Sequence, residues 1–353
     1  MGLQCRRVLT AVIAGAFPLH LVAQTPKVPY ERGLQLAWAS SITGKDDWET
    51  ILTLERVDSA EAQLRVSWNR GEKREWQHIE RAVSNRERRL ARSFYFFSST
   101  TDRRTFRGST QSLASAAILD ELKRVGRASV VLLMPEVSEV PFRGTLARIG
   151  TATESFPVLL DGTRVTLQGV RARGLLVGDL EDDFEILLLD DTEAPWVLEA
   201  TARGGKGLTG GHRLLVRIST TRRGPALEMA LDKKCVTSIH DIYFASGSDA
   251  LDSTSAPALA SIAQAMRDHA DWRITIVGHT DSIGTAPANL DLSRRRAERV
   301  RSTLAMEYGI ASDRLRADGK GETAPIDDNG SLFGRARNRR VDLERACPQQ
   351  NKK

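Results

Sequence analysis

The chain has 353 residues, of which 41% are hydrophobic and 27% are charged. This composition excludes a disordered or fibrous protein, and the length favours two or three folded domains. The formal net charge is +6, but four positive charges lie at the two ends of the chain, on Arg6, Arg7, Lys352 and Lys353. The remaining excess is small, so the charge does not indicate a nucleic-acid partner.

The first residues have the pattern of an export signal. Arg6 and Arg7 precede an uncharged, largely apolar run from Val8 to Ala23. Because this run is shorter than the roughly 20 apolar residues of a membrane span, it predicts a secretory signal peptide over residues 1–23, cleaved after Ala23. The alternative is a signal that stays uncleaved as an anchor. No later segment is apolar enough to span a bilayer as a helix, so a periplasmic protein without an integral span is expected.

In residues 27–230, the apolar character of the side chains alternates mostly with a period of two residues. Apolar side chains alternate with other side chains in residues 64–68, 164–168 and 214–219. Such alternation predicts half-buried antiparallel strands. One helix is expected around Leu119 and Leu122, with Gly126 as its stop. This region is predicted to be a mostly antiparallel β-sandwich or small β-barrel, as one unit or as two units divided near Pro135.

After residue 235, short strands and helices alternate, which predicts a second domain over residues 236–346 and a tail over residues 347–353. The order β-α-β-α-β-β indicates helices packed against one sheet, so the whole chain is of the α+β class. The expected strands are Ile242–Phe244, Ile274–Val277, Arg314–Asp318 and Val341–Glu344, and the expected helices are Pro257–His269 and Leu292–Tyr308.

The loop between the strand Ile274–Val277 and the second helix is the most informative segment. Thr280 and Asp281 follow the end of a buried strand, where open α/β folds place their ligands. Asn289 and Ser293 are both suited to cap the following helix, whose N-terminus favours a nearby anionic group. This loop is therefore the predicted binding site.

Five motifs extend this site along the chain in a characteristic order: GHTD, NLDLSRRRAERV, GIASDRL, GKGETAPIDDN and GRARNRRVDL, within residues 278–343. Over about residues 239–343 the sequence resembles the OmpA-like peptidoglycan-binding domains. The resemblance implies non-covalent binding of peptidoglycan through the diaminopimelate of its stem peptide. The first strand departs from the family pattern, because it reads DIYFASGSDAL, so the start of the first helix is expected to shift slightly.

The family's contact residues fall on two positions of this chain. Asp281 matches its loop aspartate and Arg296 matches its helix arginine. A free amino-acid end carries an ammonium group and a carboxylate, which suit an anionic acceptor and a forked cationic donor respectively. The alternatives are an Asx turn for Asp281 and a surface ion pair with Glu298 or Asp291 for Arg296. The predicted peptidoglycan-binding residues are Thr280, Asp281, Asn289, Arg296, Asn338 and Arg339, the last two from the closing motif.

No catalytic, metal or cofactor site is indicated. The six histidines do not pair with glutamate or cysteine at the spacing of metal ligands. The segment from Ala202 to Arg213 contains Gly-Lys without the Ser or Thr of a phosphate-binding loop, so it is read as a turn. The protein is therefore expected not to be an enzyme, but to tether an N-terminal adaptor domain, with an envelope protein as partner, to the cell wall or outer membrane. The alternative is a carrier or catalytic N-terminal domain delivered to the wall.

Two cysteines remain after removal of the signal, Cys235 and Cys347. They lie just before the first strand and just after the last strand of the second domain, and domain ends are often close in space. Because exported thiols tend to oxidise, an intramolecular disulfide between them is predicted. The alternative is two cysteines too far apart to be bridged.

Overall fold

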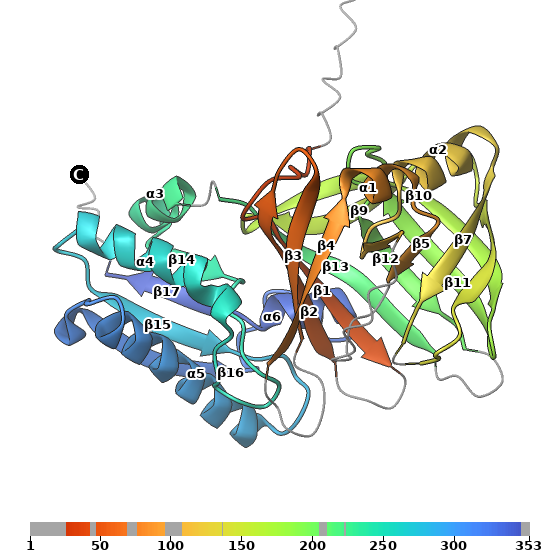
Figure 1. Cartoon of the computed structure of the whole chain (residues 1–353). Coiled ribbons are helices and arrows are strands. Elements are labelled where there is room, and N and C mark those ends of the chain that lie inside the picture. Colours follow the sequence, from red (N-terminus) through yellow and green to blue (C-terminus); the bar gives the residue numbers. More distant parts are fainter. Residues whose placement is uncertain are drawn as a thin grey trace, which may run out of the picture.

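The computed structural model describes residues 26–42, 47–68, 76–95, 108–135, 137–204, 210–221 and 224–346. The predicted signal peptide and the C-terminal tail lie outside these residues. The described chain forms two parts that lie side by side, a β-rich N-terminal part and a C-terminal part with helices over a small sheet (Figure 1). The α+β class expected from the sequence is confirmed.

The N-terminal part, here called the β region, contains one large mixed sheet. Its path runs β4-β3-β2-β1-β13-β12-β11-β10-β8-β7-β5-β6, and β9 pairs with both β10 and β13. The last pairing closes β9 to β13 into a ring of hydrogen-bonded neighbours. The strands are β1 (Gln35–Ile42), β2 (Trp48–Val57), β3 (Glu61–Trp68), β4 (Gln77–Ser84), β5 (Ser93–Tyr95), β6 (Ser109–Gln111), β7 (Arg127–Leu133), β8 (Phe142–Arg148), β9 (Glu154–Leu160), β10 (Thr163–Val177), β11 (Glu181–Leu189), β12 (Val197–Ala202) and β13 (Gly211–Ser219).

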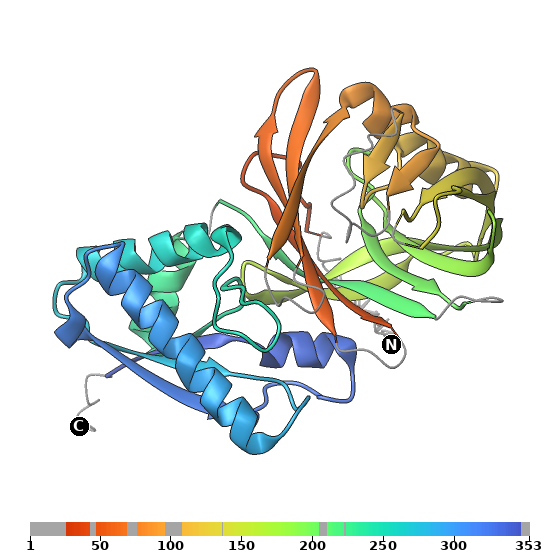
Figure 2. The ribbon, with the colours of Figure 1, turned by 60° about the horizontal axis from the view of Figure 1, so that its bottom comes forward.

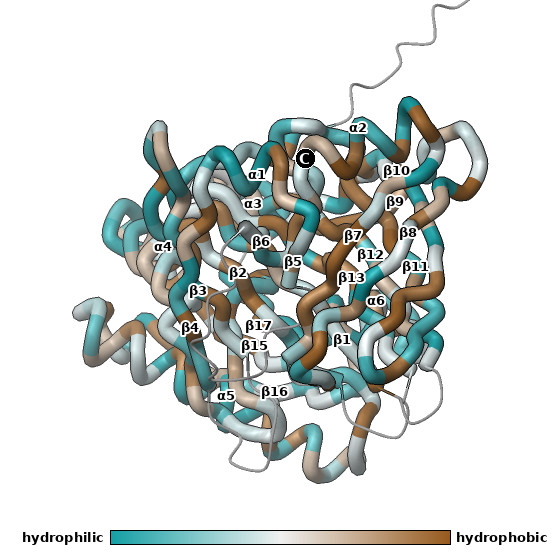
Figure 3. Tube along the Cα trace, turned by 45° about the vertical axis from the view of Figure 1, so that its right-hand side comes forward, coloured by the Kyte–Doolittle hydropathy of each residue, from teal (hydrophilic) through white to brown (hydrophobic). Residues whose placement is uncertain are grey.

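Two hydrophobic cores lie on opposite faces of the shared strands. On β11, Leu187 and Leu189 enter one core, whereas Phe184, Ile186 and Leu188 enter the other. Hydrophobic residues accordingly concentrate along the strands in Figure 3. Each core takes residues from both sides of Pro135, so the cores are not sequential halves of this region. The helices here are α1 (Asn85–Leu90) and the predicted helix α2 (Ala116–Arg124).

The C-terminal part is built on a four-stranded sheet in the order β14-β17-β15-β16, in which only β15 and β16 pair in parallel. Apolar side chains of α4 and α5 and of the strands form a third core, and Figure 2 shows α5 running along this sheet. The elements are α3 (Gly224–Lys234), β14 (Val236–Ile239), η1 (Ser253–Ser255), α4 (Ala256–Asp268), β15 (Ile274–His279), α5 (Ala286–Met306), η2 (Ser312–Arg314), β16 (Leu315–Gly321), α6 (Leu332–Asn338) and β17 (Val341–Arg345).

In the C-terminal part, the sequence prediction is wrong about the position of the first strand and about the start of the long helix. The first strand is Val236–Ile239 rather than Ile242–Phe244, because residues 236–239 pair with β17. Helix α5 begins six residues earlier than expected, and its cap is Thr285, whose hydroxyl accepts a hydrogen bond from the Ala288 N–H. Neither Asn289 nor Ser293 is the cap, since Pro287 lies in the first turn, where its fixed φ and missing N–H suit helix initiation.

Helix α6 joins the two parts. Leu332 and Ala336 of this helix, together with Tyr243, are buried in a core of the β region. Figures 1 and 2 show α6 beside the first strands of the β region. Apolar contact between the parts thus occurs next to the motif that contains Asn338 and Arg339.

Candidate functional site

The predicted binding loop is held by a close approach between α5 and the sheet. A Cβ atom added at Gly278 would lie 2.2 Å from the carbonyl oxygen of Ser293, so only glycine fits there. The Ser293 hydroxyl accepts a hydrogen bond from the Gly321 N–H at 2.9 Å. These contacts fix the start of α5 against the ends of β15 and β16, between which the loop emerges.

A cavity of about 590 Å³ opens at this end of the sheet. Five of the six predicted site residues line it: Thr280, Asp281, Asn289 and Arg296 from the loop and α5, and Arg339 from the segment after α6. The structure thus gathers segments that lie up to 59 positions apart in the sequence. Asp47, Trp48 and Glu49 of the β region form a further side of the same cavity.

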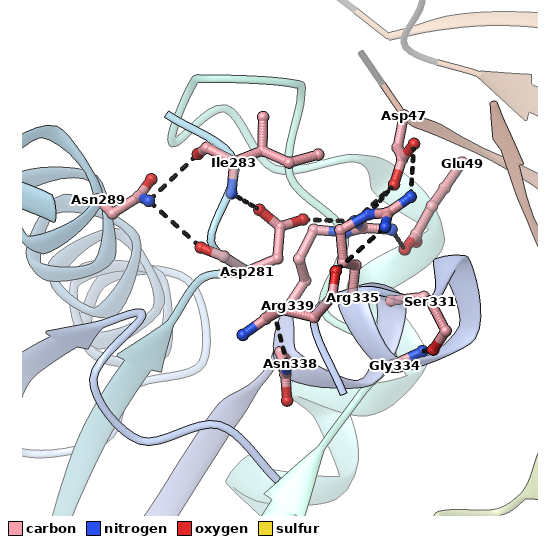
Figure 4. Close-up of polar contacts among 12 residues, drawn as sticks. Asp47, Glu49, Asp281, Ile283, Asn289, Ser331, Gly334, Arg335, Asn338 and Arg339 are labelled. Atoms are coloured by element: carbon pink, nitrogen blue, oxygen red, sulfur yellow. Dashed lines mark hydrogen bonds and ion pairs between the residues drawn. The ribbon is translucent and has the colours of Figure 1, made fainter. Parts of the chain in front are cut away.

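Asp281 has both carboxylate oxygens engaged. Oδ1 accepts a hydrogen bond from the Ile283 N–H at 3.0 Å, which is an Asx turn, and Oδ2 lies 2.6 Å from Nη1 of Arg339. The turn and the ligand interpretation are therefore compatible, because each oxygen has a second lone pair for another donor. Figure 4 shows Asp281 between Asn289 on one side and Arg339 on the other.

Arg296 is not the surface ion pair considered as its alternative. It is 8% exposed, and its guanidinium donates to the carbonyl oxygens of Ser248 at 2.9 Å and Ala245 at 3.2 Å. The guanidinium also lies 5.0 Å from the centre of the Phe244 ring. Burial lowers the pKa of Arg296 to about 10, and the positive charge of Arg339 acts in the same direction. The side chain is still a cation at neutral pH.

Thr280 and Asn289 shape the cavity in different ways. The Asn289 amide donates to the carbonyl oxygens of Asp281 at 3.2 Å and Ile283 at 3.1 Å and to Oε2 of Glu322 at 2.6 Å, so it holds the loop. Thr280 is 4% exposed, and among the described residues its hydroxyl oxygen has no hydrogen-bond partner. A buried hydroxyl of this kind is suited to a ligand.

Asn338 is fully buried and lies outside the cavity lining. Its side-chain oxygen accepts from the N–H groups of Ile326 and Asp327, and its amide donates to the Asp327 carbonyl and to Asn329. These contacts give Asn338 the role of fixing the loop before α6. They do not place it against a ligand.

Sequence reasoning missed the contribution of the β region. Asp47 accepts from Nε of Arg335 at 2.7 Å, and Oε1 of Glu49 accepts from Nη2 of Arg339 at 2.9 Å. The other oxygen of Glu49 pairs with Arg217 of β13. Arg335 is thus an interface residue. Acidic residues in a β-strand carry no local signal of such a contact.

The electrostatics of this interface agree with its geometry. Burial alone raises the pKa of Glu49, but Arg217 and Arg339 outweigh it and lower that pKa. Glu49 and Asp281 together raise the pKa of Arg339 despite its burial. Glu49 and Arg339 are therefore both charged at neutral pH.

Among the described residues no group of three or more histidine, cysteine, aspartate or glutamate side chains is placed to hold a metal ion. No helix in the described ranges is both long and apolar enough to cross a membrane. The site consists of hydrogen-bond donors, acceptors and charges around an open cavity, which is the chemistry of a binding module.

This binding module has known relatives. Residues 243–339 match the model of the OmpA family. Outer membrane porin F of Pseudomonas aeruginosa is 44% identical over 86 residues, which cover 24% of this chain and 25% of the porin. Peptidoglycan-binding protein ArfA of Mycobacterium bovis is 38% identical over 85 residues, which cover 24% of this chain and 26% of ArfA. A crystal structure of the peptidoglycan-associated lipoprotein from Burkholderia pseudomallei aligns with 31% sequence identity and a TM-score of 0.28. The aligned part covers 30% of this chain and 88% of the lipoprotein chain.

The fold and the site define a non-covalent ligand-binding domain appended to a β-rich region. That domain is an OmpA-family domain over residues 243–339. The match spans about a quarter of the length of the porin and of ArfA, and residues before 243 lie outside the family model. The predicted localisation, periplasmic and associated with the cell wall or the outer membrane, agrees with the relatives, which include an outer membrane porin and a probable lipoprotein.

Proposed function

We propose that the OmpA-family domain binds peptidoglycan non-covalently, through the diaminopimelate of its stem peptide. The free end of that residue carries an ammonium group and a carboxylate. Asp281 is assigned to the ammonium group and the forked guanidinium of Arg296 to the carboxylate, since both side chains line one cavity. The relative ArfA is a peptidoglycan-binding protein, which supports peptidoglycan as the ligand.

The observation that carries the proposal is the environment of Arg296. It is a buried cation whose hydrogen bonds among the described residues go to main-chain carbonyls, which have no net charge to oppose it. The carboxylates of Asp281 and Glu49 favour the charged form of Arg296, but burial and the charge of Arg339 outweigh them and lower its pKa. A ligand carboxylate in the cavity adds negative charge beside this buried cation and so stabilises it.

The β region is then an adaptor held at the wall, with an envelope protein as the partner we propose for it. Its contacts to α6 and Arg339 place it directly beside the binding cavity. Within the described residues, no observation favours the alternative of a carrier or catalytic β region. The proposed role of the whole protein is therefore attachment without catalysis.

Sedimentation with purified sacculi tests the proposal. Asp281→Asn and Arg296→Gln each remove one charge, and Asp281→Asn does so with little change in side-chain size. Loss of one partner of a desolvated charge pair costs about 2 to 5 kcal/mol, so the affinity is expected to fall by at least about tenfold. Arg301→Gln is the matched control, because Arg301 lies on the same helix and pairs with Glu298 away from the cavity. Undiminished sedimentation of the Asp281→Asn/Arg296→Gln double variant, folded by circular dichroism, contradicts the proposal.

The ligand assignment has its own test. Sacculi whose stem peptides carry lysine in place of diaminopimelate lack the extra carboxylate, so Arg296 has no partner in them. Wild-type protein is expected to bind these sacculi at least about tenfold more weakly. Equal binding to both wall types refutes the assignment to diaminopimelate, although it leaves peptidoglycan binding in place.

A further inference from the structure

Two carboxylates of the β region reach into the wall-binding site. Asp47 immediately precedes β2, and Glu49 is the second residue of that strand. Their side chains are 6% and 12% exposed, so the contacts that they make are largely shielded from water. Both residues line the same cavity as Asp281 and Arg296.

Arg339 connects Glu49 to Asp281. One guanidinium nitrogen, Nη2, lies 2.9 Å from Oε1 of Glu49, and the other, Nη1, lies 2.6 Å from Oδ2 of Asp281. Figure 4 shows this row of three side chains, with Arg335 and Asp47 beside it. Glu49 and Asp281 lie in different parts of the molecule. Because both bind the guanidinium of Arg339, a change at Glu49 alters the position of Arg339 relative to Asp281.

The charges of this interface balance. Asp47 pairs with Arg335, and Asp281 pairs with Arg339. Glu49 pairs with both Arg217 and Arg339. Three carboxylates thus face three arginines. Without the charge of Glu49, Arg217 and Arg339 face one carboxylate fewer. Arg339 then faces only Asp281 and, at 3.9 Å, Asp47, so three arginines are opposed by two carboxylates and the anionic side of the cavity becomes net positive. An ammonium group binds poorly in such a place, because like charges repel across a shielded site.

The docked β region leaves the cavity open. The cavity has a volume of about 590 Å³, which lies within the range of small-ligand pockets, roughly 300 to 1,000 Å³. The carboxylates of Asp47 and Glu49 therefore border the cavity without filling it. This observation favours a contribution to binding over a block of the site.

We propose that the β region is part of the wall-binding site, and that Glu49 is a positioning residue which, through Arg339, holds Asp281 ready for the ligand ammonium group. The inference rests on the proposed binding of diaminopimelate and adds to it a specificity determinant outside the OmpA-family domain. Binding of the amino-acid end then depends on both parts of the protein.

The test uses the full chain and two probes, a stem tripeptide that ends in meso-diaminopimelate with a free side-chain amine, and the same peptide with that amine acetylated. Affinities are measured by isothermal titration calorimetry. Glu49→Gln is expected to weaken binding of the free-amine peptide by about tenfold and to change binding of the acetylated peptide by less than about twofold. Glu49→Asp keeps the charge and is expected to recover part of the loss.

Glu55→Gln is the matched control, since Glu55 lies on the same strand and pairs with Arg65 away from the cavity. If Glu49 has a purely structural role, Glu49→Gln lowers the affinity for both peptides equally or for neither. Either result overturns the inference. Tighter binding by Glu49→Gln also overturns it and identifies the β region as an inhibitor of the site. If the wild-type protein binds neither peptide, the proposed ligand itself is wrong.

Discussion

Asp342 shows how a single buried carboxylate supports the binding loop from behind. It accepts hydrogen bonds from Ser238 at 2.7 Å and from Arg340 at 3.0 Å, and it lies 3.0 Å from Nε2 of His279, the residue before Thr280. Burial raises the pKa of Asp342, but His279, Ser238 and Arg340 outweigh burial and lower that pKa to about 2. The carboxylate is thus more stable in the folded chain than in the unfolded one.

This shift predicts a pH dependence of stability. Since the folded pKa of Asp342 is below the unfolded value of 3.8, its contribution is fully present above about pH 4 and is lost as the pH falls through about 2. The shift corresponds to about 2 kcal/mol. Asp342→Asn is expected to lower the free energy of unfolding by that amount at pH 7, and the difference from wild type should vanish near pH 2. Urea unfolding at several pH values measures it, and a difference that persists at pH 2 argues against this origin.

At the scale of elements, the boundaries depend on contacts that lie outside the local pattern. The apolar spacing located α4, β15 and β17 within a few residues, because these elements present a continuous apolar face to the third core. Helices α3 and α6 were not predicted. Leu332 and Ala336 of α6 are buried against the β region, and a helix as short as α6 needs such packing to form.

The close approach at Gly278 makes a prediction about α5. Gly278→Ala places a methyl group against the main chain of Ser293, so α5 must move away from β15. Such overpacking costs about 1 to 3 kcal/mol, and the shift also displaces Arg296 from Asp281. Thermal unfolding and sacculus binding should therefore both decline. Gly178→Ala, whose added atom meets its nearest neighbour at 3.2 Å, is the milder control, and an equal effect of both variants contradicts the packing argument.

At the scale of the whole molecule, the ends of the C-terminal domain meet. Val236 pairs with Glu344 across β14 and β17, and the Arg345 N–H donates to the Cys235 carbonyl at 2.7 Å. Cys235 thus lies opposite the end of β17. Cys347 lies outside the described residues, so the disulfide between them stays a prediction, supported by the nearness of the flanking strands.

Peptide mapping without reduction tests this disulfide in protein taken from the periplasm. A cross-linked peptide containing Cys235 and Cys347 is expected, and in the chain-entropy model such a long closed loop stabilises the domain by at most about 4 to 5 kcal/mol. Cys347→Ser should therefore lower the unfolding temperature, and reductant should lower that of wild type to the same value. Recovery of both cysteines as free thiols disproves the disulfide without affecting the binding site.

The sequence alone determined the β-rich character of the N-terminal region, the OmpA-family resemblance of the C-terminal part, and the loop and helix of the candidate site. These features are local, since periodic apolar residues and motifs around Asp281 and Arg296 depend on neighbours along the chain. Only the tertiary structure decided that Asn338 supports a loop while Arg339 faces the cavity, and that Glu49 meets Arg339 from 290 residues away. An ion pair between such distant residues leaves no periodic signal in the chain, because it arises only when the packing of α6 against the β region brings the two charges together.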